Sequence, residues 1–317
     1  MIIITNDKLP SIGIELLKTK FNDIVVLSSD TAESDKIEYY KNADAILSLL
    51  RDKFDRNILE QCKKLRVISN YAVGYDNIDT NTANKLKIRI CNTPNVLTNT
   101  TADLAFGIMM AAARKICVSQ QFLRKGLYHG WEPDLFLGYD IYGKTIGIIG
   151  AGKIGQAIGK RALGFNMKII YYKRSRDFDF ENITGAIYSS IDDILRKSDF
   201  ISLNTPLTKD TYHLIGKKEF GLMKPNSILI NTSRGSVINE KDLVYALKNG
   251  KIASCALDVF EFEPQITKEL MLFDNIILTP HIGSASYETR NKMALIAAQN
   301  IIDILSNNKC NNIVNGG

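Results

Sequence analysis

Three polar segments in the second half of the chain carry residue types suited to acid–base chemistry on an anion. Arg234 follows one apolar run, Glu261 and Glu263 share the segment Asp258-Val-Phe-Glu-Phe-Glu-Pro, and His281 follows another apolar run. A histidine paired with a carboxylate can donate a proton near neutral pH. An arginine offers a planar fork of donors that matches a carboxylate. These segments therefore predict a site that binds a carboxylate and delivers a proton.

A glycine-rich run at residues 150–155, Gly-Ala-Gly-Lys-Ile-Gly, lies between a strand-like run and a helical pattern. Gly150 permits a tight turn, Gly152 lets the backbone approach a pyrophosphate, and Gly155 lets the helix pack on the strand. The pyrophosphate would meet the free N–H groups and the positive dipole end of that helix. With the three polar segments, the run predicts reduction of a 2-keto acid by a nicotinamide hydride.

The acidic residue expected about 20 residues beyond such a run, where it holds a ribose 2′-hydroxyl, is absent. Lys173, Arg174, Ser175 and Arg176 follow the next strand-like run instead. Basic residues attract a 2′-phosphate, so we expect NADP(H) to be preferred, with NAD(H) as the alternative cofactor. The competing interpretation is a solvated basic surface. A change of Lys173 to Asp is expected to move the preference toward NADH.

Strand-like and helix-like runs alternate along the chain, which predicts parallel α/β sheets. One long helix is expected from Asn99 to Leu127, and an amphipathic helix from Tyr287 to Leu305. The carboxyl ends of parallel strands meet at one edge of a sheet, where ligands bind. The strands are expected at Ile2–Thr5, Ile24–Leu27, Ala45–Leu49, Val67–Asn70, Ile88–Cys91, Thr145–Ile149, Lys168–Tyr172, Phe200–Asn204, Ser227–Asn231, Ala253–Leu257 and Asn275–Leu278.

The composition is that of an ordinary globular protein of about two domains. The 317 residues are 45% hydrophobic and 23% charged, with a net charge of +6. No basic run interleaved with aromatics points to nucleic acid, and no apolar run is long enough for a membrane span. The N-terminus lacks the features of a signal peptide. The five cysteines are scattered, which predicts reduced thiols and a cytoplasmic location. No metal-ligand spacing links the three histidines, so no metal site is expected.

The order of the glycine run, Ser233-Arg-Gly235, the segment from Asp258 and Thr279-Pro-His-Ile-Gly resembles the D-isomer-specific 2-hydroxyacid dehydrogenases. In the first half, Asn70-Tyr-Ala-Val-Gly-Tyr-Asp-Asn-Ile-Asp79 resembles the substrate loop of that family. The segment Thr93-Pro-Asn-Val-Leu-Thr-Asn-Thr-Thr-Ala-Asp-Leu104 resembles the start of its interdomain helix. The resemblance covers essentially the whole chain and is nearest to the glyoxylate/hydroxypyruvate reductase branch.

The resemblance implies two doubly wound parallel-sheet domains with a cleft between them. A flavodoxin-like substrate-binding domain would comprise residues 1–99 and 287–317, and a Rossmann NAD(P)-binding domain residues 100–286. The implied enzyme is an oxidoreductase of CH–OH groups that transfers a hydride between NADP(H) and a small 2-keto acid such as glyoxylate or hydroxypyruvate. A homodimer formed through the cofactor domain is also implied.

Residue roles carry over by position from the family. His281 would be the general acid, Glu263 its partner, and Arg234 the group that binds and polarises the substrate. Val73 and Gly74 would offer N–H groups to the substrate carboxylate. The implied cofactor-binding residues are Thr101, Gly150, Gly152, Lys153, Ile154, Gly155, Lys173, Arg174, Ser175, Leu203, Thr232, Asp258, Gly283 and Ser284, with Asp258 on the nicotinamide carboxamide.

Several alternatives stay open at this level. Arg51 follows a strand and either selects a substrate anion or is an exposed surface residue. Glu261 competes with Glu263 as the partner of His281, whereas His129 and His213 are expected to be surface or packing residues. The other functions are an NAD(P)-sensing corepressor-like protein on the same scaffold and an NAD-dependent D-lactate or phosphoglycerate dehydrogenase.

Overall fold

The computed structural model describes residues 1–316, so residue 317 of the predicted segment 287–317 lies outside the described range. The chain forms two compact units, one comprising Met1–Leu97 with the residues from Ser284 onward, the other Thr98–Gly283. The chain therefore leaves the first unit once and returns to it. In the described residues, no helix is both long and apolar enough to cross a membrane.

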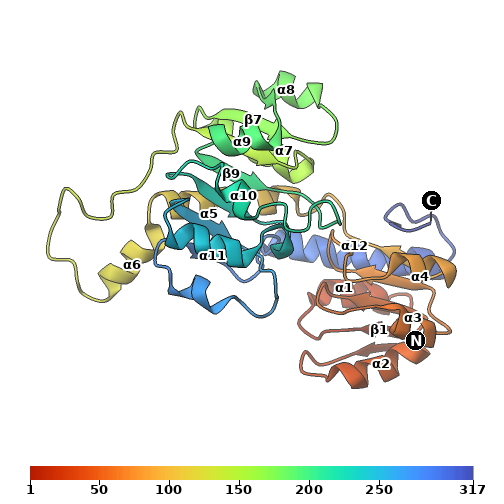
Figure 1. The fold of residues 1–317 in the computed structure, drawn as a ribbon. Coiled ribbons are helices and arrows are strands. Elements are labelled where there is room, and N and C mark those ends of the chain that lie inside the picture. Colours follow the sequence, from red (N-terminus) through yellow and green to blue (C-terminus); the bar gives the residue numbers. More distant parts are fainter. Residues whose placement is uncertain (317) are drawn as a thin grey trace. The chain divides into compact units, whose positions relative to one another are not determined.

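The first unit is built on a five-stranded parallel sheet with the strand order β2-β1-β3-β4-β5, the flavodoxin-like order. Its strands are β1 (Ile2–Ile4), β2 (Ile24–Val26), β3 (Ala45–Ser48), β4 (Val67–Asn70) and β5 (Arg89–Cys91). Its helices are α1 (Ser11–Lys18), α2 (Glu33–Asn42), α3 (Arg56–Gln61), α4 (Thr80–Lys85) and α12 (Tyr287–Leu305). Helix α12, blue in Figure 1, packs beside α1, and Gly13 permits this because an added Cβ would lie 2.7 Å from the Ala294 carbonyl oxygen.

The second unit is built on a seven-stranded parallel sheet with the order β12-β11-β10-β9-β6-β7-β8 (Figure 1). Its strands are β6 (Thr145–Ile149), β7 (Lys168–Tyr172), β8 (Ile187–Tyr188), β9 (Phe200–Leu203), β10 (Ile228–Asn231), β11 (Ser254–Leu257) and β12 (Ile277–Leu278). Its helices are α5 (Thr98–Ala113), α6 (Ile116–Arg124), α7 (Lys153–Leu163), α8 (Phe178–Thr184), α9 (Ile191–Lys197), α10 (Lys217–Phe220) and α11 (Glu240–Lys248).

The strand order of the second unit reverses between β6 and β9, and this reversal fixes where a ligand can bind. The chain runs outward from β6 through β7 to β8, then crosses back to β9 on the other side of β6. The central strands are buried on both faces, since all four residues of β9 and of β10 are buried. In such a sheet the crevice at the carboxyl ends of the two diverging strands is the binding position.

The predicted helix from Asn99 to Leu127 is wrong as a single element. The structure has two helices, α5 and α6, separated at Lys115, which takes a left-handed conformation with φ of 52°. The sequence contains no helix breaker here. The returning chain ends α5 instead, because Tyr139 N–H donates to the Ala113 carbonyl at 2.8 Å. Gly138 allows this approach, since an added Cβ would lie 2.3 Å from the same oxygen.

Candidate active site

His281 and Glu263 form a hydrogen-bonded pair at the carboxyl edge of the seven-stranded sheet. His281 Nδ1 lies 3.0 Å from Glu263 Oε2, and both side chains keep about a third of their surface exposed, 36% and 37%. Burial opposes the charge of Glu263, but the hydrogen bond and charge of His281 hold the pKa of Glu263 below its ordinary value. The Phe260 N–H, which donates to Glu263 Oε1 at 2.9 Å, and the charge of Arg234 act in the same direction. The imidazole is thus oriented by its Nδ1 and keeps Nε2 for a ligand.

Asp258 holds the loop that carries His281. Its carboxylate accepts hydrogen bonds from the Thr279 hydroxyl at 2.6 Å and from the N–H groups of Ile282 and Gly283, each at 2.8 Å. Burial raises the pKa of Asp258, and these donors oppose that rise. His281 has φ of 52°, a conformation that non-glycine residues adopt only where surrounding contacts impose it. Asp258 therefore fixes the backbone from which the His281 side chain projects.

Arg234 directly follows the turn that ends β10. Asn231 organises this turn, because its amide donates to the Arg234 carbonyl at 2.9 Å and its oxygen accepts from Ser233. The next residue, Gly235, lies against the segment that carries the two glutamates. An added Cβ there would lie 1.8 Å from the Phe260 carbonyl carbon, a distance no atom tolerates. Arg234 and Glu263 are thus placed together by backbone packing that requires glycine at 235.

The glycine-rich turn between β6 and α7 fits a dinucleotide. Gly150 has φ of 95°, and an added Cβ would lie 2.7 Å from the carbonyl carbon of Asn204. An added Cβ on Gly155 would lie 2.5 Å from the Gly150 carbonyl oxygen, so the helix can approach the strand only without a side chain. At Gly152 a Cβ would meet nothing within 4 Å, which leaves open space at the start of α7. Lys153 and Ile154 begin that helix.

Unpartnered polar atoms at the ends of β9 and β10 also fit a cofactor. The Thr232 hydroxyl, the Asn204 side-chain oxygen and the Thr205 hydroxyl are buried and have no hydrogen-bond partner within residues 1–316. Buried polar atoms normally find partners, so these positions suit a polar ligand. Sequence reasoning named Thr232 but missed Asn204 and Thr205, although both directly follow a strand. Leu203 is fully buried in the core, so only its backbone is available to a ligand.

The basic segment after β7 divides into paired and outward-facing residues. Lys173 Nζ lies 2.6 Å from Asp177 Oδ2, and Arg176 pairs with Glu181 at 2.7 Å. The hydrogen bond from Lys173 is the largest cause of the lowered pKa of Asp177. Arg174 and Ser175 are exposed between these pairs. The nearest acid, Asp177, lies four residues after Lys173, where it caps α8 and binds Lys173.

Two more of the predicted cofactor residues are neighbours in the second unit. Gly283 is buried, and an added Cβ would lie 3.3 Å from the methyl group of Thr101 on α5. Ser284 belongs to the first unit, where its carbonyl accepts a hydrogen bond from Ser286 N–H at 3.0 Å. Ser286 in turn caps α12 by accepting from Thr289 N–H at 3.2 Å.

In the first unit, Val73 and Gly74 lie in the turn after β4 with both carbonyls held inward. Val73 O accepts from the Asn92 amide and Gly74 O from the Asn70 amide, each at 2.8 Å. Neither N–H group donates a hydrogen bond within the part of the chain that the structure describes. Two N–H groups in one turn, with their carbonyls turned away, are suited to bind an anion.

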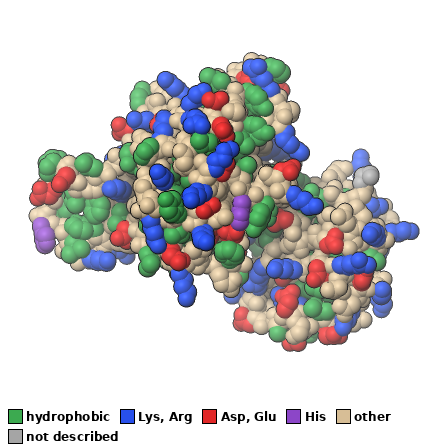
Figure 2. Space-filling view, in the orientation of Figure 1, with side chains coloured by type: hydrophobic (Ala, Val, Ile, Leu, Met, Phe, Trp, Pro, Cys, Tyr) green, Lys and Arg blue, Asp and Glu red, His purple; other side chains and the backbone are tan. Residues whose placement is uncertain are grey.

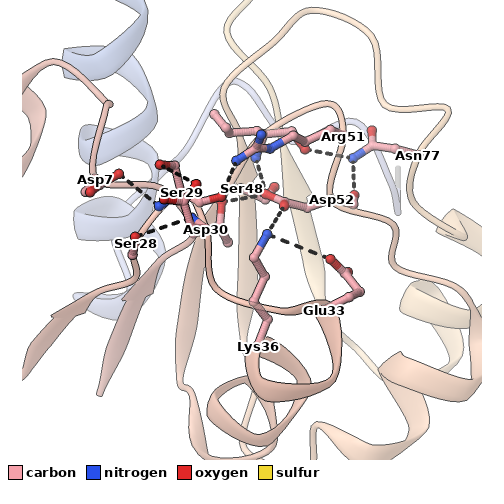
Figure 3. A network of polar contacts seen from close by, with 12 residues as sticks. Asp7, Ser28, Ser29, Asp30, Glu33, Lys36, Ser48, Arg51, Asp52 and Asn77 are labelled. Carbon is pink, nitrogen blue, oxygen red and sulfur yellow. Dashed lines mark hydrogen bonds and ion pairs between the residues drawn. The ribbon is translucent and has the colours of Figure 1, made fainter. Parts of the chain in front are cut away.

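Arg51 lies in a turn after β3 that a buried carboxylate holds (Figure 3). Asp52 accepts from the Leu49 N–H at 2.8 Å and the Thr5 hydroxyl at 2.5 Å, and Lys36 Nζ lies 3.3 Å from it. Arg51 itself is exposed, and its guanidinium reaches the Ser29 carbonyl at 3.4 Å. The first unit therefore presents Arg51 at the same strand edge as Val73 and Gly74.

Glu261 has a histidine of its own. His213 Nε2 lies 2.5 Å from Glu261 Oε1, and Glu261 Oε2 accepts from Glu240 N–H at 3.1 Å. The Glu261 side chain is only 8% exposed. Of the two alternatives for the partner of His281, the structure therefore has Glu263. The sequence motif carried no signal that His213 would be paired.

A glycine turn at the reversal of strand order and a histidine–carboxylate pair at the same sheet edge define a dinucleotide-dependent oxidoreductase. Within residues 1–316, no three His, Cys, Asp or Glu side chains gather to hold a metal. The sequence profile of the D-isomer specific 2-hydroxyacid dehydrogenase NAD binding domain matches residues 106–283. The chain belongs to that dehydrogenase family.

Known relatives resemble this chain over nearly its whole length. A glyoxylate reductase of Thermococcus litoralis is 48% identical over 314 residues, which cover 97% of this chain and 95% of the relative. The crystal structure of a Thermus thermophilus protein has a TM-score of 0.93 at 33% identity and covers 99% of this chain and 100% of that one. The structure of a glyoxylate reductase from Paecilomyes thermophila has a TM-score of 0.89 at 34% identity. The match covers 99% of this chain and 97% of that one.

Proposed function

We propose that the protein reduces a small 2-keto acid, such as glyoxylate or hydroxypyruvate, with NADP(H) as the preferred cofactor. The observation that carries the proposal is the His281–Glu263 pair, with Arg234 close enough for its charge to lower the pKa of Glu263. The relatives named glyoxylate reductase support this substrate class. In this proposal the second unit binds the cofactor and carries Arg234 and His281, and the turn at Val73 and Gly74 of the first unit receives the substrate carboxylate.

The proposed reaction gives a role to predicted substrate-binding and catalytic residues. When bound, the nicotinamide supplies the hydride that attacks the carbonyl carbon. Arg234 binds the keto acid and draws charge toward its oxygen, while the Val73 and Gly74 N–H groups receive the carboxylate. His281 donates a proton from Nε2 to the carbonyl oxygen, because its Nδ1 is held by Glu263. With a nicotinamide hydride, this proton would complete the conversion of the carbonyl group into a hydroxyl group.

The proton that His281 gives up returns from solvent, since the pair is partly exposed. Glu263 stabilises the imidazolium form that precedes each transfer. Asp258, in addition to any contact with the nicotinamide carboxamide, keeps the His281 loop in place through Ile282 and Gly283. In the reverse direction the same imidazole would accept the proton of the hydroxyl group.

Absorbance at the nicotinamide band, with a panel of 2-keto acids and each cofactor, tests the proposal. Consumption of NADPH with glyoxylate or hydroxypyruvate is the expected result. Turnover restricted to pyruvate with NADH would make the protein a D-lactate dehydrogenase instead. Tight cofactor binding with no turnover of any keto acid would favour the corepressor-like alternative.

Arg174 and Ser175 are the residues proposed to receive the 2′-phosphate. Both are exposed after β7, whereas Lys173 is occupied by Asp177. Arg174→Ala is expected to reduce the NADPH:NADH preference about 10- to 100-fold, the value of one charged hydrogen bond. Arg196→Ala is the matched control, because Arg196 is equally exposed but precedes β9 at the opposite edge of the sheet. An unchanged preference in Arg174→Ala would exclude the assignment.

We also propose that a second copy of the chain covers the arm formed by α6 and residues 125–142. The arm extends away from the seven-stranded sheet of its own unit (Figure 1), and hydrophobic side chains gather on it (Figure 2). Its exposed apolar residues include Leu123, Trp131, Leu137 and Tyr142. Exposed apolar side chains that gather on one segment are typical of an interface. Light scattering on a size-exclusion column should give the mass of a dimer, and a monomer would contradict the proposal.

All five cysteines are free thiols. Proteins of reducing compartments keep their cysteines in this form. This supports the proposal that the protein works in the cytoplasm.

A further inference from the structure

Two cysteines far apart in the sequence face each other in the first unit. The sulfur atoms of Cys91 and Cys310, 219 residues apart, lie 3.8 Å from each other. Cys91 is fully buried in β5, whereas Cys310 is partly exposed in the segment after α12. Within residues 1–316, no other two cysteine sulfurs are in contact.

The C-terminal segment beyond Cys310 is tied to β5. Ile313 forms an antiparallel bridge with Cys91, and Val314 N–H donates to the Ile90 carbonyl at 2.8 Å. Asn315 accepts from the Ile90 N–H at 2.6 Å. These contacts, two of the backbone and one of the Asn315 side-chain oxygen, keep the two thiols opposed without a covalent bond.

The two thiols differ in their surroundings and in the direction in which their pKa values are shifted. A hydrogen bond between the two thiols lowers the pKa of Cys310 and raises the pKa of Cys91, and it is the largest cause of each shift. Partial burial and the charge of Asp303 oppose the Cys310 thiolate, and Asn300 lies 3.5 Å from its sulfur. The thiolate is the reactive form, so Cys310 combines the lower pKa with access to solvent.

We propose that Cys310 and Cys91 form a redox modification site, at which Cys310 reacts with a hydroperoxide and Cys91 resolves the product into a disulfide. The Cys310 thiolate attacks one peroxide oxygen, the O–O bond breaks, and the other oxygen leaves as hydroxide or alkoxide, giving a sulfenic acid. The Cys91 sulfur then attacks the Cys310 sulfur, and the S–O bond breaks with loss of water. Two thiols are oxidised by two electrons, and the peroxide is reduced by two.

The position of Cys91 brings this modification next to the proposed substrate turn. Asn92 follows Cys91 directly, and its side chain donates to the Val73 carbonyl at 2.8 Å. The Asn92 carbonyl accepts a hydrogen bond from the side-chain amide of Asn300 in α12 at 3.0 Å. A disulfide would therefore join the C-terminal segment covalently to the strand that supports this turn. The chemistry at sulfur itself does not depend on the proposed function.

Peptide mapping of the whole protein after treatment with hydrogen peroxide tests the site. The expected result is a cross-linked peptide pair that contains Cys91 and Cys310, lost again on treatment with dithiothreitol, with two fewer alkylatable thiols per chain. Cys117→Ser is the matched control, because Cys117 is exposed but has no thiol beside it, and this variant should behave like the wild type.

Two variants separate the roles of the two sulfurs. Cys310→Ser should lose the cross-link and the rapid loss of thiols. Cys91→Ser, which keeps a hydrogen-bonding side chain beside Cys310 but cannot form the disulfide, should let the Cys310 sulfenic acid accumulate, where a 1,3-dione probe labels it. If Cys310→Ser is oxidised as fast as the wild type, or if Cys117 reacts while Cys310 remains free, the proposal is overturned.

Discussion

The second unit contains two histidine–glutamate pairs that use neighbouring carboxylates of one short segment. Glu261 pairs with His213, and Glu263, two residues on, pairs with His281. The first pair is the more enclosed, since Glu261 is 8% exposed and also accepts from the backbone of Glu240, while His213 is 27% exposed. The second is open, since both its side chains keep about a third of their surface exposed. The difference supports the proposal that the second pair, and not the first, exchanges a proton with a ligand.

The contrast shows that a histidine–carboxylate contact is not by itself a catalytic feature. His213 also stacks on Tyr212, with ring centroids 4.0 Å apart, and its second nitrogen faces Asn239. His281 has one ring nitrogen engaged by Glu263, and it is carried on a strained loop that Asp258 holds. The arrangement of the remaining partners, rather than the pair itself, supports the proposed role of His281.

Both pairs depend on Gly235, so Gly235→Ala should disrupt them together and have the largest effect. The Cβ would overlap the Phe260 backbone, and a clash of this kind costs more than about 4 kcal/mol. Urea denaturation should show the loss. Gly107→Ala in α5 is the control, since its Cβ would meet nothing within 4 Å, and it should stabilise by about 0.5–1 kcal/mol. A stable Gly235→Ala with normal turnover would contradict this account.

His281→Ala tests the open pair. Loss of the general acid should lower kcat by about 10²–10⁴-fold, while the dissociation constant of the cofactor stays within a few-fold of the wild-type value. Stopped-flow turnover and fluorescence titration of the cofactor measure the two quantities. Undiminished kcat would remove His281 from the mechanism.

Glu263→Gln tests how much the charge of Glu263 contributes to stability. The pKa of Glu263 is lowered in the folded protein, so its stabilisation is present above the ordinary glutamate pKa of about 4.3 and is lost as the pH falls through the folded value. The variant should therefore be less stable than the wild type at neutral pH, with a gap that narrows below about pH 4. Denaturation at a series of pH values measures this gap, with the exposed Glu269→Gln as the control. A difference in stability between the two proteins that widens at low pH would contradict a lowered pKa of Glu263.

His213→Ala should show the smallest change in turnover. It removes a partner from a nearly buried carboxylate, so stability should fall by on the order of 1 kcal/mol. The kcat should stay within a few-fold of the wild type. A drop in kcat as large as that of His281→Ala would break the comparison between the two pairs.

Much of the fold and of the candidate site is readable from the chain. The strand at Thr145–Ile149, the glycine turn and the final helix Tyr287–Leu305 have the bounds that their patterns predict. Local patterns suffice there, because buried strands are short apolar runs and a tight glycine turn needs specific residues. The two-residue strand β8 was not predicted, since Ile187 and Tyr188 are too few to form a pattern.

The break at Lys115 and the partners of the two glutamates depended on contacts that no local pattern encodes. A returning segment ends α5 although its residues favour helix. Glu261 and Glu263 look alike in sequence, and their partners lie 48 and 18 residues away.

The sequence by itself determined the class of fold, the position of the dinucleotide turn and the edge at which Arg234 and His281 lie. It did so because parallel strands place all their carboxyl ends on one edge, so the order of elements dictates which side chains gather there. Only the tertiary structure decided which glutamate faces His281, which basic residue after β7 remains open, and that Cys91 meets Cys310. These outcomes depend on distances of a few ångströms between segments far apart in the chain, which packing sets.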